Sequence, residues 1–472
     1  MYQDGKKPAS GSGRVYPNEE QKQILSQLIG ATRRSYNICL MVHNAKEGDV
    51  IYAKIDRLAK EQLKCKNGEL KFIRDKDGNE IPKLRGWKLA KQQCARLEEK
   101  KNGGEWLKEI PLAIRDSGIR DMQKAITSTK AAQEEKKNRG EKSKDAKFTY
   151  RTRHDATQTF SFPGRVWNQR NGKIRKLFSG MKLFKEKLPE STEREVRVRM
   201  DRVGKVELIF AEVKKVLEPS SLKSYHQTVA LDPGVRTFQT LYDADGYGIE
   251  WGDGDMKKIH ASCRQIDRII SIIDQKKNEA KKKKGKDKRN GTWALKRAKS
   301  RKFQRLKNKV KECHRKLALF LCENYKVILI PKFEVSKMTR KKMNGRPRKI
   351  NNKAARLMRT WSHYAFREYL KSKAEFFPGV KVVEVSEAWT SKTCDECGTI
   401  HRNLGSNKVF KCPSPSCHHT ADRDLHAAKN ILLRYLSRMH PECNGSKGPG
   451  VLAPLPFNLP TGGVVVESPV KF

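Results

Sequence analysis

The stretch TSKTCDECG at residues 390–398, followed by CPSPSC at residues 412–417, holds two closely spaced cysteine pairs. Two residues separate the cysteines of the first pair, four separate those of the second, and fourteen lie between the pairs. Thiolates on two turns can surround one tetrahedral Zn²⁺, and four protein ligands leave no vacant position. We therefore predict a structural zinc module at 393–417, with these ligands: Cys394, Cys397, Cys412 and Cys417.

The wider second pair leaves the ligand set open. Pro413 and Pro415 can stiffen its loop, and His401, His418 or His419 could replace a thiolate. Four free buried thiols are the alternative, but the polar N-terminus without an apolar signal segment indicates a reducing compartment, where clustered cysteines bind metal. The other seven cysteines are expected to be small buried residues: Cys39, Cys65, Cys94, Cys263, Cys313, Cys322 and Cys443.

Outward from the module, short apolar strands alternate with long helices, which predicts a multidomain α+β chain. In this C-terminal half, strands are predicted at 228–232, 237–242, 327–330 and 380–385, and helices at 256–322 with a basic interruption at 281–289, at 354–376 and at 427–439. Residues 336–353 read as a basic connector, and the tail at 441–472 as disordered.

The N-terminal half changes from helical to strand patterns near Lys147. Asn18 is the expected cap of a helix that runs to about His43. Two more helices are predicted, at 86–100 and 113–135. The segment at 45–85 is expected to be a polar stretch with a turn, residues 1–15 a flexible leader, and residues 130–147 a mobile basic linker. Alternation around the turn at 202–204, with two or three more short strands in 148–190, predicts a small barrel.

The charge of the chain indicates a polyanionic partner. Its 472 residues include 102 Lys and Arg against 53 Asp and Glu, a formal net charge of +49. Such a surplus favours nucleic acid, because no apolar span or lipidation motif indicates a membrane. Basic runs at 130–153, 281–289, 296–315 and 337–353 suit phosphate contacts, although any single lysine there could simply face solvent.

Two aspartates lie at the ends of predicted elements. Asp232 closes a strand before a Pro-Gly turn, and Asp424 precedes the last helix. Singly, Asp232 reads as a turn residue and Asp424 as a helix cap. Together with a glutamate they would supply the oxygen ligands that Mg²⁺ prefers and that two-metal phosphodiester cleavage requires. Only the fold can bring them together.

Four motifs occur in the order found in the TnpB superfamily, whose relatives are type V CRISPR effectors and eukaryotic Fanzor nucleases. They are LDPG at 231–234, the strand at 327–330, TSKTC-x2-CG at 390–398 and DRD-x2-AA-x-NI at 422–431. The likeness covers about residues 14–435, and the wide second cysteine pair resembles Fanzor more than bacterial TnpB. It implies a RuvC-type, RNase H-like nuclease domain with an inserted zinc ribbon, preceded by a helical recognition lobe and a WED-like barrel.

The implied domain bounds follow from this resemblance. They are a leader or first barrel strand at 1–15, a helical lobe at 16–146, a barrel at 147–222, a RuvC domain at 223–392 and 418–440, a zinc module at 393–417 and a tail at 441–472.

The resemblance also assigns the catalytic residues. Asp232 matches the first RuvC carboxylate and Asp424 the third, with Asp422 as a neighbour. His426 stands where the family often has Asn. These roles imply that both aspartates are Mg²⁺ ligands.

The second carboxylate departs from the family pattern, because Pro331 stands where Glu commonly follows the strand. Some relatives supply this Glu from a later segment, which favours Glu387. Glu334 is the runner-up. Glu384 is third, because strand alternation would turn it to another face.

The function implied is a transposon-associated, RNA-guided, Mg²⁺-dependent endonuclease that cuts guide-matched double-stranded DNA beside a short duplex motif. Its partners would be a noncoding guide RNA and target DNA, and its metals two Mg²⁺ and a structural Zn²⁺. We expect a monomer with one RNA, nuclear in a eukaryote and otherwise cytoplasmic.

Two other functions stay open. One is a nuclease-dead RNA-guided DNA-binding protein, suggested by Pro331, and the other is a guide-independent, structure-specific nuclease. The residues that contact the duplex motif are expected within 16–45 and 148–215. Trp106, Trp361 and Trp389 are expected to lie in the core.

Overall fold

The computed structural model divides into two compact units, residues 8–214 and residues 215–472 with 1–7, which are described separately. No helix in the described part of the chain is long and apolar enough to cross a membrane. The structure describes residues 6–63, 72–74, 80–82, 94–95, 97–98, 105–107, 109–140, 148–183, 188–215, 226–282, 291–343, 346–348, 350–405, 407–439 and 465–467.

Two long helices, α1 (Glu19–Asn44) and α4 (Leu112–Asn138), pack together in the first unit. Their crossing is close at Gly118, where a Cβ atom would lie 2.2 Å from the Thr32 carbonyl oxygen. Every residue other than glycine carries that atom, so Gly118 permits this packing.

The predicted helix beginning after Asn18 is confirmed. The Asn18 side chain accepts a hydrogen bond from the Gln21 backbone N–H at 2.8 Å, and the Gln21 side chain accepts one from Asn18 in return. The prediction of a mobile linker is wrong for residues 130–138, because α4 continues through them. The basic residues in the last turn of α4 interact favourably with the helix dipole.

The polar stretch at 45–85 holds more structure than predicted. Helix α2 (Val50–Leu63) lies there, as does a hairpin of β2 (Phe72–Arg74) and β3 (Glu80–Pro82) that flanks the predicted turn. A short 3₁₀ helix, η2, spans Glu105–Leu107. Most of the helix predicted at 86–100 lies outside the described residues, as does the linker at 141–147.

A five-stranded sheet completes this unit, in the order β4-β6-β7-β1-β5. Its core gathers large aromatic residues, with Trp167 packed against Phe162, Phe178 and Phe210. The strands are β1 (Lys6–Tyr16), β4 (Thr157–Phe162), β5 (Lys182–Leu183), β6 (Val196–Asp201) and β7 (Val206–Lys215), and helices α5 (Gly164–Asn168) and α6 (Lys173–Ser179) lie between β4 and β5.

The sheet confirms the hairpin predicted around residues 202–204, since β6 and β7 pair antiparallel. The prediction of a flexible leader is wrong for residues 6–15, because they form most of strand β1. The alternative prediction, that this segment is the first strand of the sheet, is confirmed. The Gly and Ser residues of this segment suggested flexibility, but pairing to neighbouring strands satisfies its backbone.

The second unit contains a six-stranded sheet, in the order β14-β11-β8-β9-β10-β17. Strand β11 pairs parallel with both β8 and β14, whereas β9 is antiparallel to β8 and β10. The carboxyl ends of the three parallel strands therefore meet at one edge. The strands are β8 (His226–Pro233), β9 (Gln239–Asp243), β10 (Gly248–Trp251), β11 (Tyr325–Pro331), β14 (Lys381–Val385) and β17 (Val465–Glu467).

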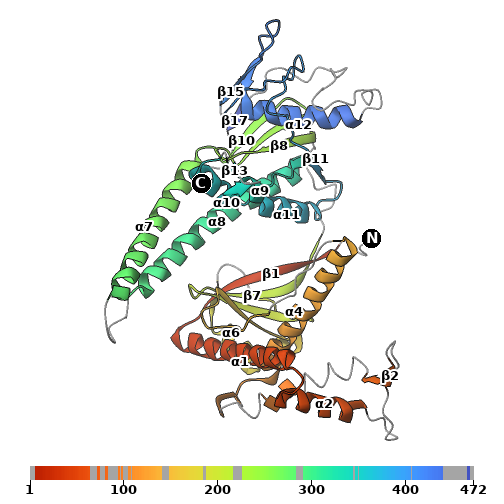
Figure 1. Ribbon diagram of the computed structural model, residues 1–472, viewed down its shortest axis with the longest axis vertical. Coiled ribbons are helices and arrows are strands. Elements are labelled where there is room, and N and C mark those ends of the chain that lie inside the picture. Colours follow the sequence, from red (N-terminus) through yellow and green to blue (C-terminus); the bar gives the residue numbers. More distant parts are fainter. Residues whose placement is uncertain are drawn as a thin grey trace. The chain divides into compact units, whose positions relative to one another are not determined.

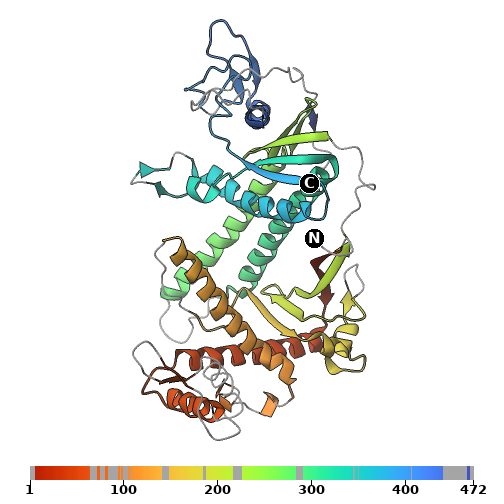
Figure 2. The same ribbon diagram turned by 90° about the vertical axis from the view of Figure 1, so that its right-hand side faces the viewer.

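Helices cover both faces of this sheet (Figures 1 and 2). The hairpin of α7 (Asp255–Lys282) and α8 (Trp293–Asn324), together with α10 (Asn352–Trp361) and α11 (His363–Ala374), packs on one face. Helix α12 (Arg423–Met439) packs alone on the other.

The predicted helices of this unit are confirmed with two corrections. The helix expected at 354–376 is two helices, because Ser362 adopts the left-handed conformation between them. The basic connector contains α9 (Val335–Met338) and the short strands β12 (Lys342–Met343) and β13 (Arg346–Pro347).

The tail and the basic interruption are only partly described. The disordered tail is wrong at residues 465–467, where β17 pairs parallel with β10. The rest of the tail from 440 onward lies outside the described residues, and so does the basic loop at 283–290.

Strand alternation decides which side chains can meet. Val229 and Leu231 pack with the four-helix face, whereas Ala230 packs against α12. Because successive residues of a strand point to opposite faces, Asp232 shares the α12 face with Ala230. The same alternation turns Val383 and Val385 of β14 toward α12.

Candidate metal centres and nucleic-acid interface

The four predicted zinc ligands come together. Cys394 and Cys397 flank a tight turn in which the Gly398 N–H donates to the Cys394 carbonyl at 3.0 Å, and Gly398 has a φ of +74° that favours glycine. The second pair lies beside the small sheet of β15 (Val409–Lys411) and β16 (Thr420–Asp422), where the Cys412 N–H donates to the His419 carbonyl at 2.9 Å.

The sulfur geometry fits a tetrahedral zinc ion. All four Sγ atoms lie within 4.8 Å of one another. The Cys394–Cys417 and Cys397–Cys412 Sγ pairs are 3.9 and 3.4 Å apart. Zn–S bonds of about 2.3 Å at tetrahedral angles place the sulfurs about 3.8 Å apart. Hydrogen bonding by Thr399 lowers the pKa of the Cys397 thiol to about 6, which favours the thiolate that binds metal.

The proposed histidine substitutes lie outside this cluster. The four thiolates form a complete set without His401, His418 or His419. The four-residue gap of the second pair is accommodated by a turn in which the Cys417 N–H donates to Ser414 at 3.1 Å. The cysteine cluster can therefore bind zinc with sulfur ligands alone.

The three predicted carboxylates converge from distant segments. Burial, followed by the negative charges of Asp424 and Glu387, raises the pKa of Asp232 to about 8, while Arg423 opposes the shift. Burial also raises the pKa of Glu387. Asp232 ends β8, Glu387 follows β14 and Asp424 begins α12, so the α12 face of the sheet edge gathers all three. The four sulfur atoms all lie within 4.8 Å of one another, but the oxygen atoms of these three carboxylates do not form so close a group in the described structure.

Two aspartates at the start of α12 have different roles: one caps the helix, and the other belongs to the candidate carboxylate site. Asp422 accepts hydrogen bonds from the backbone N–H groups of Asp424 and Leu425, at 2.9 and 3.1 Å, so Asp422 is the cap. The alternative that Asp424 caps the helix is therefore wrong. Its carboxylate instead accepts two hydrogen bonds from the Arg423 guanidinium, at 3.0 and 2.8 Å.

The two other glutamates occupy different surroundings. Glu334 is half exposed and pairs with Lys337 at 2.7 Å. Glu384 faces α11, as alternation predicted, and pairs there with Lys371 and Arg367. Of the three candidates, the structure brings only Glu387 close enough to Asp232 to affect its ionisation.

Known proteins resemble the chain in the regions that carry these groups. Residues 363–431 match the family described as "Cas12f1-like, TNB domain", and residues 13–44 match one described as "Helix-turn-helix domain". The TnpB-like proteins L79 and L770 of Acanthamoeba polyphaga mimivirus are each 32% identical over 221 residues, 47% of this chain and 39% of each relative. Over these regions the chain is similar to TnpB-like proteins.

A shorter match is to the CRISPR-associated endodeoxyribonuclease Cas12f1 of Sulfoacidibacillus thermotolerans. It is 31% identical over 91 residues, 19% of this chain and 21% of that protein. The chain spans half or less of the length of these curated relatives.

Two buried residues of α12 connect the segment that carries the carboxylates to the cysteine cluster. The Asn430 side chain donates to the carbonyls of Thr390 and Thr393, at 2.8 and 2.7 Å. His426 Nε2 lies 2.7 Å from the same Thr393 carbonyl. Asn430 and Arg423 were part of the sequence motif, but nothing in the pattern predicted these contacts.

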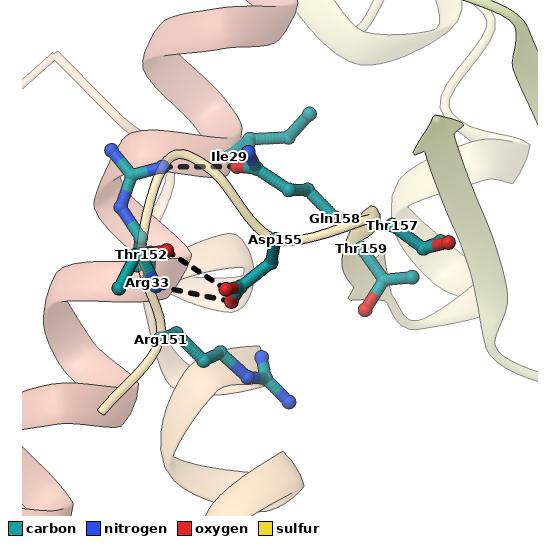
Figure 3. A pocket seen from close by; sticks show the side chains of 8 residues that line it. All are labelled: Ile29, Arg33, Arg151, Thr152, Asp155, Thr157, Gln158 and Thr159. Atoms are coloured by element: carbon teal, nitrogen blue, oxygen red, sulfur yellow. Dashed lines mark hydrogen bonds between the residues drawn. The ribbon is translucent and has the colours of Figure 1, made fainter. Parts of the chain in front are cut away.

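A small polar pocket lies where α1 meets β4 and the segment before it (Figure 3). Arg33 of α1 donates to the Gln158 side chain at 2.9 Å, and Asp155 accepts from the Thr152 backbone and hydroxyl at 3.0 and 2.8 Å. The volume is about 90 Å³. The Arg33 bond joins α1 to β4, and the Asp155 bonds close the turn before that strand.

A larger open pocket of about 480 Å³ lies along the same helix. Arg33, Arg34 and Asn37 line it together with Trp106 and Tyr150, which are 40% and 55% exposed. Guanidinium groups and exposed aromatic rings suit phosphates and bases. The prediction that Trp106 lies in the core is therefore wrong. It is also wrong for Trp389, which is 48% exposed, and right for Trp361.

Proposed function

We propose that the chain is a transposon-associated, RNA-guided DNA endonuclease that depends on Mg²⁺. The observation that carries the proposal is the convergence of Asp232, Glu387 and Asp424 on one face of a parallel sheet edge. A carboxylate whose pKa is raised by burial, and further by two neighbouring carboxylates, favours a bound cation.

The strand arrangement supports an RNase H-like, RuvC-type domain at 223–392 and 418–440. In chain order, the first to fifth strands of this sheet are β8, β9, β10, β11 and β14. They lie side by side in the order 3-2-1-4-5, and the second strand, β9, is antiparallel to both neighbours. In the same proposal 393–417 is an inserted zinc ribbon, 16–146 a recognition lobe, and 147–222 with β1 a WED-like domain.

The donor set fits Mg²⁺, which takes carboxylate oxygens and keeps several waters. Asp232, Glu387 and Asp424 would hold the metal. When bound, Mg²⁺ lowers the pKa of the attacking water and stabilises charge on the leaving oxygen. Arg423 fixes the Asp424 carboxylate, and the Asn430 contacts fix the loop that follows Glu387.

The partners proposed are a noncoding guide RNA and matched double-stranded DNA. A formal charge of +49 suits two nucleic acids, whose phosphates give affinity without sequence information. Pairing with the guide would read the target sequence, while the protein would read shape and a short duplex motif. The open pocket along α1, with Arg33, Arg34 and Trp106, is the proposed contact to that duplex.

The test is cleavage of a plasmid that carries a guide-matched target by protein purified with its own RNA. We expect cutting that needs both Mg²⁺ and the RNA. Glu387→Ala should lose activity and Glu334→Ala should keep it; the reverse pattern would refute the choice of Glu387.

Pro331 favours the second candidate, a nuclease-dead RNA-guided DNA-binding protein. Pro331 is two residues after Leu329 in β11 and therefore lies on the same α12 face. The strand position from which a carboxylate could face Asp232 thus holds a proline. Tight guide-dependent binding without cutting in Mg²⁺ or Mn²⁺ would establish that function. Cutting of branched DNA without RNA would instead indicate a structure-specific nuclease.

A further inference from the structure

A second group of metal-ligating side chains lies beside the cysteine cluster but shares no residue with it. Asp395 Oδ1, His419 Nε2 and His426 Nδ1 all lie within 4.8 Å of one another. The carboxylate oxygen is 2.8 Å from His419 and 3.1 Å from His426. These residues come from the first cysteine turn, from the position just before β16 and from α12, so the group joins three segments.

Within the described part of the structure, none of the three facing atoms makes a hydrogen bond of good geometry, although they lie within ion-pairing distance of one another. The side chains of Asp395 and His426 are 2% and 0% exposed, and that of His419 is 20% exposed. Buried polar atoms are almost always paired, and three orphans that face each other need a common explanation.

The hydrogen bonds of His426 fix its ring. Its Nε2 lies 2.7 Å from the Thr393 carbonyl, an acceptor. The Asn430 amide nitrogen is 3.0 Å from the same Nε2, but its two hydrogens go to the Thr390 and Thr393 carbonyls, so Nε2 carries a proton. In the neutral ring Nδ1 then presents a lone pair to the Asp395 carboxylate. Two acceptors at 3.1 Å repel each other unless a cation or an additional proton lies between them.

We propose that Asp395, His419 and His426 hold a second zinc ion, separate from the one at the cysteines. Two histidines and one carboxylate are a known zinc donor set that leaves a coordination position open. Zinc binds such nitrogen and oxygen ligands more tightly than iron(II) or manganese.

The surroundings of two ligands match those of metal-bound side chains. Ligating histidines and carboxylates are usually held through their other polar atom. His426 is held at Nε2 by Thr393, and Asp395 is held at Oδ2 by the Lys429 ammonium at 2.7 Å. Each therefore keeps one atom free to face the ion.

A pocket of about 250 Å³ opens on the group. Asp395, His419 and His426 line it together with Thr420 and Leu425. It gives the open coordination position access to water or to an anionic ligand. His426 is two residues from Asp424, so, if the proposed nuclease function holds, this zinc fixes the start of the helix that carries a catalytic carboxylate.

The experiment counts metal in the full chain bound to its RNA, by mass spectrometry after saturation with zinc and gel filtration. We expect two zinc ions per chain in the wild type. Asp395→Asn and His426→Gln should each retain one, and Cys412→Ser should lose the other. His418→Ala, which alters a neighbouring histidine outside both groups, is the matched control and should retain two.

Cobalt substitution identifies which site is lost. Thiolate-bound cobalt gives a charge-transfer band that nitrogen and oxygen ligands do not. The cobalt-loaded His426→Gln variant should keep this band while its cobalt content halves, even if the variant is less stable. One zinc per chain in the wild type would overturn the proposal, because the group would then be an ion-pair network with a protonated histidine. Metal counts do not depend on cleavage, so either proposal can fail alone.

Discussion

The cysteine cluster and the carboxylate site are two candidate metal centres that the chain builds in opposite ways. The four sulfurs come from 24 consecutive residues, 394–417, and reach tetrahedral spacing through local turns. The carboxylates come from positions as far apart as Asp232 and Asp424, and only the parallel sheet brings them together. The first centre depends on chain geometry, the second on the whole fold.

The difference extends to electrostatics. At the cysteine cluster, hydrogen bonding by Thr399 lowers the pKa of Cys397, while burial raises the pKa of Cys394 and of Cys412. At the other centre, burial and the like charges of two other carboxylates raise the pKa of Asp232. Four sulfur ligands suit a permanent structural ion, whereas carboxylates that repel one another suit an ion that arrives with substrate.

The largest expected effect is on cleavage. Asp232→Asn should lower the cleavage rate by about 10³-fold or more, because a ligand of the proposed ions is lost while the fold remains. Zinc content should not change. Rates measured on guide-matched plasmid, with metal analysis of the same samples, check both statements.

Glu334→Gln is the matched control, since it removes a carboxylate that pairs only with an exposed lysine in the described structure. It should stay within about twofold of the wild type. An Asp232→Asn variant that still cuts at the wild-type rate would remove the carboxylates from the mechanism.

A smaller effect is expected at the cysteines. Cys412→Ser should lose the zinc of this cluster and lower cleavage by about 10- to 100-fold, because the Thr390–Thr393 loop that contacts α12 loses its support. Cys322→Ala removes a buried thiol far from the cluster and should lower stability only. Full zinc content in Cys412→Ser would mean that the ion lies elsewhere.

The contrast explains what could be predicted from the sequence. The cysteine ligands follow from spacing alone, since the turn geometry is encoded within a few residues. The strands and helices of the second unit follow from apolar periodicity, and that Glu384 turns away from Asp232 follows from strand alternation. Each of these inferences uses neighbours in the chain.

What sequence reasoning missed depends on contacts between distant residues. The Gly-Ser leader becomes strand β1 because other strands pair with it. Trp389 is exposed at a positive φ of 69°, which no composition rule suggests. Asn430 reads as an ordinary helix residue until Thr390 and Thr393 are placed beside it.

Asn430 tests whether the two centres are coupled. Asn430→Leu leaves the buried Thr390 carbonyl without a donor and removes one of two donors from the Thr393 carbonyl, which should cost about 1–3 kcal/mol of stability. Cleavage should fall about tenfold while zinc stays bound, because the loop after Glu387 shifts. Thermal unfolding, zinc analysis and cleavage on the same preparation measure the three quantities. Wild-type cleavage in a destabilised variant would show that the centres work independently.

The smallest expected effect is a gain of stability at the carboxylate site without Mg²⁺. The folded pKa of Asp232, about 8, exceeds the unfolded value of about 3.9, so ionisation costs the wild type stability as pH rises from about 4 to 8. Asp232→Asn removes that cost and should be more stable by about 1–3 kcal/mol at pH 8, with a smaller difference at pH 5. Melting temperatures at both pH values, in buffer that retains zinc, measure the difference. Added Mg²⁺ should stabilise the wild type and leave the variant unchanged; equal stabilisation of both would place the ion elsewhere.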